Sequence, residues 1–221
     1  MKVLIACEES QRVCIEFRKR GHDAFSCDIQ ECSGGHPEWH ILGDVKTIVN
    51  GRCSFVLQNG ERKSIDGEWD LIIAHPPCTY LSNAGACRMF RVIDGKRYVN
   101  YDRYQKMKAG REFFEMFLNC NCEKIAIENP LPMKICELPP PSQIVQPFDF
   151  GDPFSKKTLL WLKGLPPLFS TGLCKDHETF LPSCTSRYSK GFGGGSGIAK
   201  EKKERSKTFP GIAAAMAEQW G

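Results

Sequence analysis

The sequence predicts an α/β fold built on a largely parallel sheet, and two patterns lead to this prediction. Short apolar runs rich in β-forming residues recur along the chain, at residues 2–6, 24–28, 69–74, 124–127 and 158–162. Segments with helical spacing of apolar residues, at 11–20 and 101–119, follow the first and third runs. Strands that alternate with helices in this way are typical of a parallel sheet covered by helices.

The first elements are marked by their ends. The run 2–6 (KVLIA) is typical of a buried strand and lacks the longer apolar stretch of a signal peptide. Gly21 follows the helix predicted at 11–20, where glycine commonly closes a helix. The strand at 24–28 ends in Asp28, and we expect a loop at 29–40 because it contains two glycines and a proline.

Proline and glycine also delimit the later elements. The continuous apolar run 69–74 (WDLIIA) stops at Pro76-Pro77, as expected for a buried parallel strand. The strand at 124–127 is followed by Glu128-Asn129-Pro130. After the strand at 158–162 the pattern breaks down, and an alanine-rich helix begins near Pro210-Gly211.

These boundaries divide the chain into three parts. We expect a catalytic core at 1–165, a short loop-rich region at 166–205, and a C-terminal helix at 206–221 that returns to the core. The second part includes the glycine-rich stretch 191–197 and the first residues of a cationic run at 200–207. Such a run attracts phosphates or forms a solvated loop.

Composition limits the class of protein. The chain has 221 residues and a net charge of +4, which suits one globular domain. No apolar run approaches the roughly 20 residues of a membrane span, so we expect no membrane partner. Its twelve cysteines, without a signal peptide, are expected to be reduced thiols in a cytoplasmic protein.

Polar residues gather where the predicted strands end. Ligands of parallel α/β sheets bind beyond the carboxyl ends of the strands. The residues that fall there are Glu8, Glu9, Asp28, Asp44, Cys78, Glu128 and Asn129. Cys78, behind two prolines, suits a nucleophilic thiolate, although it also suits a packed cysteine. A buried Glu128 with a raised pKa suits proton exchange with a substrate, although it also suits a strand-end cap.

The order Pro77-Cys78, Glu128-Asn129, a basic strand and a C-terminal helix resembles the DNA cytosine-C5 methyltransferases. The resemblance implies a Rossmann-like class I fold that uses S-adenosylmethionine, with a mostly parallel sheet and helices on both faces. It implies that Cys78 attacks C6 of a flipped-out cytosine in DNA. It further implies that Glu128 contacts N3 and the exocyclic amine while C5 receives the methyl group.

The resemblance also implies roles for other residues. For the cofactor, Asp28 would bind the ribose hydroxyls and Asp44 the adenine amine, while Pro76 would line the site. Glu8 and Ser10 would hold the methionine amine by their side chains. For the substrate, the implied residues are Ser82, Asn129, Lys156 and Thr158.

Three departures from the family pattern are evident. The stretch Ala6 to Gln11 (ACEESQ) lacks the glycines of the family's first motif, and Lys156 and Thr158 stand in a segment that usually carries arginines. Only about forty residues separate Leu162 from Ser206, where the family has a long target-recognition region. Even a small sequence-reading module buries about 600 Å² of protein surface. We therefore expect weak or short-site specificity, a partner subunit, or a non-polymer substrate such as a cytidine nucleotide. Compact chains of this kind resemble the orphan enzymes of bacteriophages, which implies action in the cytoplasm of a bacterial or phage-infected cell.

The sequence leaves alternatives open. The chain would also suit an enzyme that modifies free pyrimidine nucleotides, or an inactive binding protein that keeps the fold. His75-Pro76-Pro77-Cys78 partly resembles the motif of amino-methyltransferases, without its aromatic residue. Cys174, His177 and Cys184 are possible zinc ligands, although the main expectation is no metal. The arginines of the 79–104 loop suit either phosphate binding or a solvated face. Oligomeric state and target sequence are left open.

Overall fold

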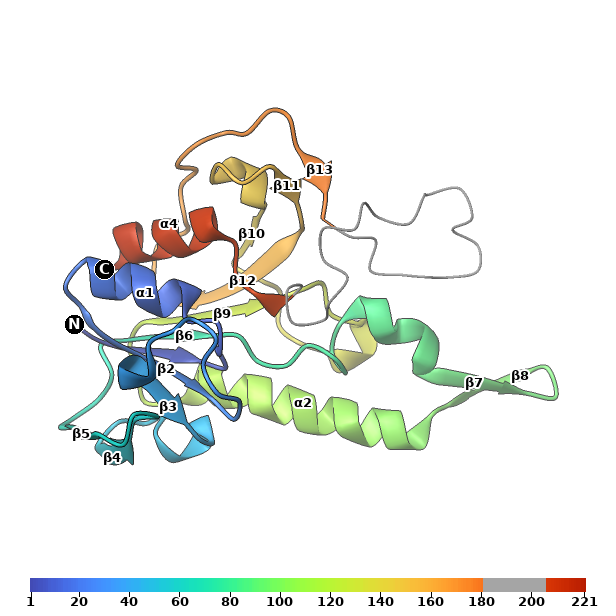
Figure 1. The fold of residues 1–221 in the computed structure, drawn as a ribbon. Helices are drawn as coiled ribbons and strands as arrows, with labels where there is room; N and C mark the ends of the chain where they lie inside the picture. The colour runs from blue at the N-terminus through green and yellow to red at the C-terminus, as the bar shows by residue number, and fades with distance from the viewer. Residues whose placement is uncertain (181–205) are drawn as a thin grey trace.

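The computed structural model describes residues 1–180 and 206–221. Its centre is a seven-stranded sheet with the strand order β10-β12-β9-β6-β1-β2-β3 (Figure 1). The strands are β1 (Lys2–Ala6), β2 (Asp23–Asp28), β3 (His40–Leu42), β6 (Leu71–Ala74), β9 (Ile125–Asn129), β10 (Gln143–Val145) and β12 (Thr158–Lys163). The predicted α/β class with a mostly parallel sheet is therefore confirmed.

The direction of the strands defines the site-bearing edge. β3, β2, β1, β6 and β9 run parallel to one another, whereas β12 is antiparallel to both of its neighbours, β9 and β10. The strand order reverses between β1 and β6, as it does in Rossmann-like sheets. Loops after these two strands therefore diverge and leave room for a ligand between them.

Helices cover both faces of the sheet (Figure 1). On one face, α1 (Arg12–Lys19) and α4 (Pro210–Trp220) pack together over the sheet. Their buried side chains join those of Val3, Ile5, Leu71 and Ile73 in one apolar cluster. On the other face, α2 (Tyr101–Asn119) joins a second cluster with Leu4, Ile72 and Ile127. The alternation of adjacent strand residues between the two clusters follows from the two-residue period of a strand.

Most predicted elements form, with shifted ends. Gly21 closes α1 with a φ of 80°, and its N–H donates to the carbonyl of Arg18, as expected for a terminating glycine. The predicted strand at 124–127 extends instead through Glu128 and Asn129. These two residues pair with Leu160 and Leu159 of the antiparallel strand β12, which prolongs the ladder beyond the apolar run.

Several short elements were not predicted. Three pairs of strands lie outside the main sheet: β4 (Cys53–Val56) with β5 (Arg62–Ile65), β7 (Phe90–Ile93) with β8 (Lys96–Val99), and β11 (Phe154–Ser155) with β13 (Glu178–Thr179). Short 3-10 helices are η1 (Pro37–Trp39), η2 (Val45–Thr47), η3 (Asn83–Arg88), η4 (Lys134–Cys136) and η5 (Pro147–Asp149). These strands are mainly exposed and mix charged with apolar residues, so they lack a buried run that would reveal them.

No helix within residues 1–180 and 206–221 is both long and apolar enough to span a membrane. The cationic run at 200–207, the glycines at 191–197 and Cys184 fall wholly or largely outside the described residues.

Replacement of Phe114 by alanine tests the packing of α2 on the sheet. Phe114 is fully buried, and its ring meets the ring of Trp161 edge-on with centroids 5.0 Å apart. Phe114→Ala should lower the free energy of unfolding by about 3–5 kcal/mol because it removes apolar area and leaves a cavity. Urea denaturation measures the loss. The exposed Lys108→Ala on the same helix is the control, expected within about 0.5 kcal/mol of wild type; equal effects would contradict this packing.

Candidate functional site

The site begins with the register of three parallel strands. Ala6 of β1 pairs with Ala74 of β6, and Ala74 pairs with Ile127 of β9. The following residues on β6 and β9, His75 and Glu128, therefore lie side by side at the carboxyl end of the sheet. Because side chains alternate along a strand, both point to the face that α1 and α4 cover.

His75 and Glu128 form a buried pair. His75 Nδ1 lies 3.3 Å from Glu128 Oε2, and the two side chains are 8% and 18% exposed. The second ring nitrogen of His75 is buried and has no hydrogen-bond partner in the part of the chain that the structure describes. The pair is therefore largely shielded from water, and Nε2 of His75 is left able to make one further hydrogen bond.

The charges of this pair favour ionised groups. Burial alone would raise the pKa of Glu128, but the hydrogen bond and charge of His75, together with the charge of Lys156, lower it. Burial would lower the pKa of His75, but Glu128 and Glu8 raise it. The raised pKa expected for Glu128 is therefore wrong, because sequence reasoning placed no cation beside it. His75 is the functional candidate whose importance the sequence analysis missed.

Glu8 holds the start of α1. Its carboxylate accepts hydrogen bonds from the backbone N–H of Val13 at 2.7 Å and of Cys14 at 3.3 Å. Burial raises its pKa to about 7, although His75 and these two N–H groups act in the opposite direction. Glu8 lies between β1 and α1 at the predicted cofactor edge, but its oxygens are already engaged with the helix.

The loop from Cys7 to Gln11 contains no glycine, although two of its residues have a backbone conformation that favours glycine. Cys7 and Gln11 have φ values of 59° and 58°, a left-handed conformation that favours glycine. The side-chain amide of Gln11 holds it in this conformation. Its Nε2 donates to the carbonyl of His36 and to Ser26 Oγ at 3.2 Å, and its Oε1 accepts the N–H of His36. Ser10, predicted to bind the cofactor, is buried beside Gln11. Gly34 packs closely against it, since a Cβ at position 34 would lie 2.7 Å from the backbone oxygen of Ser10.

Two carboxylates lie on the other side of this loop. Asp28 ends β2, and its Oδ1 accepts the N–H of Gln30 at 2.9 Å. Asp44 follows β3, and its Oδ1 accepts the N–H of Lys46 at 3.0 Å. Between them in sequence, Ile29 is 78% exposed. Ile29 therefore leaves an apolar side chain exposed directly after the strand-ending acid.

Cys78 lies half-buried in the turn after β6, and the chain fixes this turn at several points. The carbonyl of Cys78 accepts the N–H groups of Leu81 at 3.1 Å and Ser82 at 2.8 Å. Asn129 is buried and donates from Nδ2 to the carbonyl of Pro76 at 3.3 Å. Ser82 Oγ accepts the N–H of Ala84 and so begins η3. Pro76, Ser82 and Asn129 thus make contacts that position the cysteine.

Thr158, the first residue of β12, and Lys156, two residues before it, reach the same edge. Because β12 is antiparallel, its first residues lie beside the last residues of β9. Thr158 is buried, and its Oγ1 donates to the carbonyl of Lys156 at 3.1 Å. Lys156 Nζ lies 5.7 Å from the ring centre of Phe180 and 5.6 Å from that of Phe209. A narrow hollow beside them is lined by Glu128, Lys156, Thr158, Lys207, Thr208, Phe209 and Ile212.

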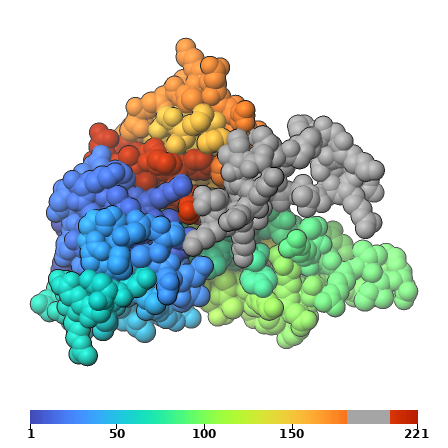
Figure 2. Space-filling view, in the orientation of Figure 1, coloured from blue at the N-terminus to red at the C-terminus, as the bar shows by residue number. Residues whose placement is uncertain are grey.

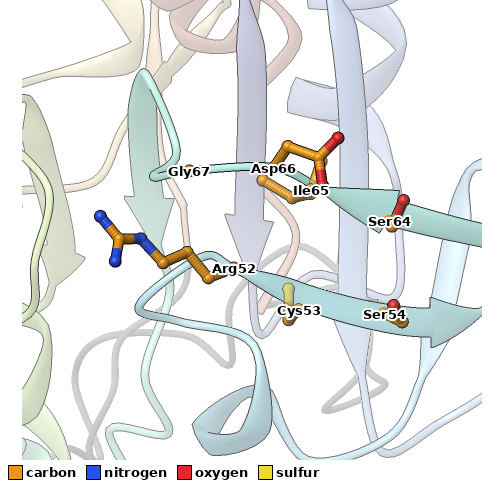
Figure 3. A pocket seen from close by; sticks show the side chains of 7 residues that line it. All are labelled: Arg52, Cys53, Ser54, Ser64, Ile65, Asp66 and Gly67. Carbon is orange, nitrogen blue, oxygen red and sulfur yellow. The ribbon is translucent and has the colours of Figure 1, made fainter.

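A broader groove lies elsewhere, on the β4–β5 hairpin (Figure 3). It measures about 390 Å³ and is lined by Arg52, Cys53, Ser54, Ser64, Ile65, Asp66 and Gly67. The carbonyl of Asp66 accepts a bond from Nζ of Lys2, the first residue of β1, at 3.1 Å. The groove therefore lies toward the amino end of that strand, away from Cys78 and Glu128.

The proposed zinc ligands cannot be compared as a set, because Cys184 lies outside the described residues. His177 stacks on Phe148 with ring centres 4.0 Å apart, and its Nδ1 lies 3.3 Å from the carbonyl of Cys174. No cluster of three or more potential metal-ligating side chains occurs among residues 1–180 and 206–221.

Stability measured against pH tests the environment of Glu8. A glutamate whose pKa rises from 4.5 to about 7 on folding favours the folded state when protonated. That contribution is complete below about pH 4.5 and is lost as the pH rises to about 7. Glu8→Gln cannot ionise, so its unfolding free energy relative to wild type should increase by about 2–3 kcal/mol between pH 5 and pH 8.

Urea denaturation at the two pH values provides the measurement. Glu112→Gln, the same change at an exposed position of α2, is the control and should alter the unfolding free energy by less than about 0.5 kcal/mol. A constant difference between Glu8→Gln and wild type would show that Glu8 is not held in this way.

Comparison of the chain with models of known protein families and with curated proteins found no match. The functional argument therefore depends on the geometry of the residues at the carboxyl edge of the sheet.

Proposed function

We propose that this chain is a compact, Rossmann-like class I methyltransferase that transfers a methyl group from S-adenosylmethionine to C5 of cytosine in DNA. The observation that carries the proposal is the shared position of Cys78 and the His75–Glu128 pair. The pair is buried at the carboxyl ends of β6 and β9, next to the point between β1 and β6 where the strand order reverses, and Cys78 follows His75 after only two prolines. A thiol and a proton-carrying pair at one strand edge are what addition to a pyrimidine requires.

The residues on the β1–β3 side fit the cofactor by their chemistry. Asp28 would accept hydrogen bonds from the ribose hydroxyls and Asp44 from the adenine amine, while the exposed Ile29 offers an apolar surface to the ring. The left-handed turn at Cys7 and Gln11 keeps the loop tight without glycine. Bound there, the cofactor supplies an electrophilic methyl group on a positively charged sulfur. The retained turn favours this proposal over an inactive protein that has lost its cofactor site.

The protein's own residues would then activate the base. Sγ of Cys78, as the thiolate, forms a bond to C6 of cytosine, and the electrons of the C5–C6 double bond make C5 nucleophilic as N3 takes a proton. Once C5 carries the methyl group, a water molecule would take the C5 proton, the electrons of that C–H bond would restore the C5–C6 double bond, and the Sγ–C6 bond would break. N3 would return its proton to Glu128, and the thiolate of Cys78 would be regenerated. Extrusion of the base from the duplex is needed because the thiolate must approach C6 from above the ring plane, which the neighbouring bases cover within the stack.

His75 provides the proton in this scheme. Without substrate, Glu128 favours the protonated imidazolium of His75, and His75 favours the ionised carboxylate of Glu128. When the cytosine edge meets Glu128, the proton on Nδ1 of His75 passes to the carboxylate and onward to N3. His75 is a positioning and relay residue in this scheme, because it acts through Glu128.

Replacement of Cys78 tests the chemistry directly. Incubation with S-adenosylmethionine and duplex DNA containing 5-fluorocytosine should trap wild type as a covalent adduct, since fluorine at C5 prevents release of the cysteine. Cys78→Ala should give no adduct and no turnover, while its affinity for S-adenosylmethionine stays within about threefold. The exposed Cys87→Ala in η3 is the matched control and should still form the adduct. An adduct with Cys78→Ala would overturn the mechanism, and methylation of dCMP without methylation of DNA would identify a nucleotide enzyme.

The pH dependence of turnover tests His75. The pair holds its proton only below the raised pKa of His75, so wild-type turnover should fall as the pH rises through that pKa. His75→Gln should lower turnover on the order of 100-fold, because a positioned acid–base group contributes about that much. It should also remove this fall of turnover with rising pH. His177→Gln, at an exposed position, should keep the wild-type profile; an unchanged profile in His75→Gln would contradict the relay.

A further inference from the structure

The β7–β8 hairpin projects from the body of the molecule (Figures 1 and 2). It belongs to a separate two-stranded sheet and shares no ladder with the central one. All eight of its strand residues except Phe90 are exposed, so neither face is covered by the parts of the chain that the structure describes. Isolated two-stranded ribbons are only marginally stable in water, so this exposure needs an explanation.

The base of the hairpin is fixed to the Cys78 turn. Met89, immediately before β7, is fully buried, and its carbonyl accepts the N–H of Asn100 just after β8 at 2.8 Å. From α2, Arg103 donates to the carbonyl of Thr79, the residue after Cys78, at 3.0 Å. The arm is therefore attached to the segment that carries the proposed nucleophile.

The surface of the arm combines positive charge with apolar groups. Across residues 88–99 there are four basic side chains and one acidic one, Asp94. Ladder pairs mix the two kinds: Arg91 lies opposite Tyr98, and Val92 lies opposite Arg97. Exposed fractions reach 72% for Val92, 55% for Ile93 and 50% for Tyr98. Large exposed apolar groups of this kind mark interaction surfaces.

Duplex DNA fits this surface by charge and by shape. Basic side chains neutralise phosphates, and apolar groups contact thymine methyls. A two-stranded ribbon also enters the major groove, which is about 12 Å wide. We infer that the β7–β8 hairpin is a DNA-docking arm. It would supply DNA contacts in addition to those of the short region at 166–205. This inference rests on the proposed function, because it takes DNA as the substrate.

The test measures binding of a fluorescein-labelled 30-base-pair duplex by the full chain in fluorescence anisotropy. Arg91→Glu/Lys96→Glu reverses two charges on the arm. Arg62→Glu/Lys63→Glu makes the same charge change on the other exposed hairpin, β4–β5, toward the opposite end of β1. The arm variant should weaken binding on the order of 10–100-fold. The slope of the logarithm of affinity against the logarithm of salt concentration should become less negative by about two, because two phosphate contacts are lost. The β4–β5 variant should change affinity less than about threefold.

Equal losses in both variants, or no loss in the arm variant, would overturn the inference. So would stronger binding of wild type to anionic phosphatidylserine vesicles than to DNA, with the arm variant impaired on vesicles alone. Melting temperatures and affinity for S-adenosylmethionine, measured for each variant, show whether the fold is kept.

Trapping with 5-fluorocytosine DNA at saturating concentration separates the two proposals. An adduct in both variants with equal DNA affinity would refute the arm alone, whereas arm-dependent DNA binding without any adduct in wild type would refute the C5 mechanism alone.

Discussion

The in-register ladder of β1, β6 and β9 is the constraint on which the rest of the site depends. Pairing of Ala6 with Ala74 and of Ala74 with Ile127 puts three strand ends in one row. The next residues, His75 and Glu128, then meet on the same face of the sheet. A slip of one residue in either strand would turn one of these side chains to the α2 face and separate them. The register itself is stabilised by the apolar residues behind it, so the core and the site are specified together.

Two carboxyl groups at this edge, Glu8 and Glu128, are buried, and their surroundings compensate for the lost hydration in different ways. Glu128 keeps its charge because the imidazole of His75 lies beside it and lowers its pKa. Glu8 has its pKa raised to about 7, and it satisfies both oxygens with backbone N–H groups of α1. Neighbouring groups whose environments separate their pKa values are suited to distinct acid and base roles. Here the two roles are structural for Glu8, which holds the start of α1, and catalytic in the proposed mechanism for Glu128, which stays charged beside His75.

The periodicity of the sequence was sufficient for the central elements but not for the contacts between them. β1 and α2 form at the predicted residues, because a continuous apolar run and a helical stripe each report a buried surface directly. The extension of β9 to Asn129 depends on β12, a strand about 30 residues later in the chain. The effect of His75 on Glu128 likewise depends on residues 53 positions apart. No local pattern reports either contact, so the pKa of Glu128 was predicted in the wrong direction.

The loop after β1 forms a tight turn without glycine. Gln11 adopts a left-handed conformation that costs on the order of 1 kcal/mol for a residue with a side chain. Its amide repays that strain by tying together the loop at His36 and the strand residue Ser26, which a glycine cannot do. The side chain of Gln11 therefore makes this turn a cross-linked one. Under the proposed function, a stiff loop on the cofactor side would leave the substrate side as the part that adjusts when DNA binds.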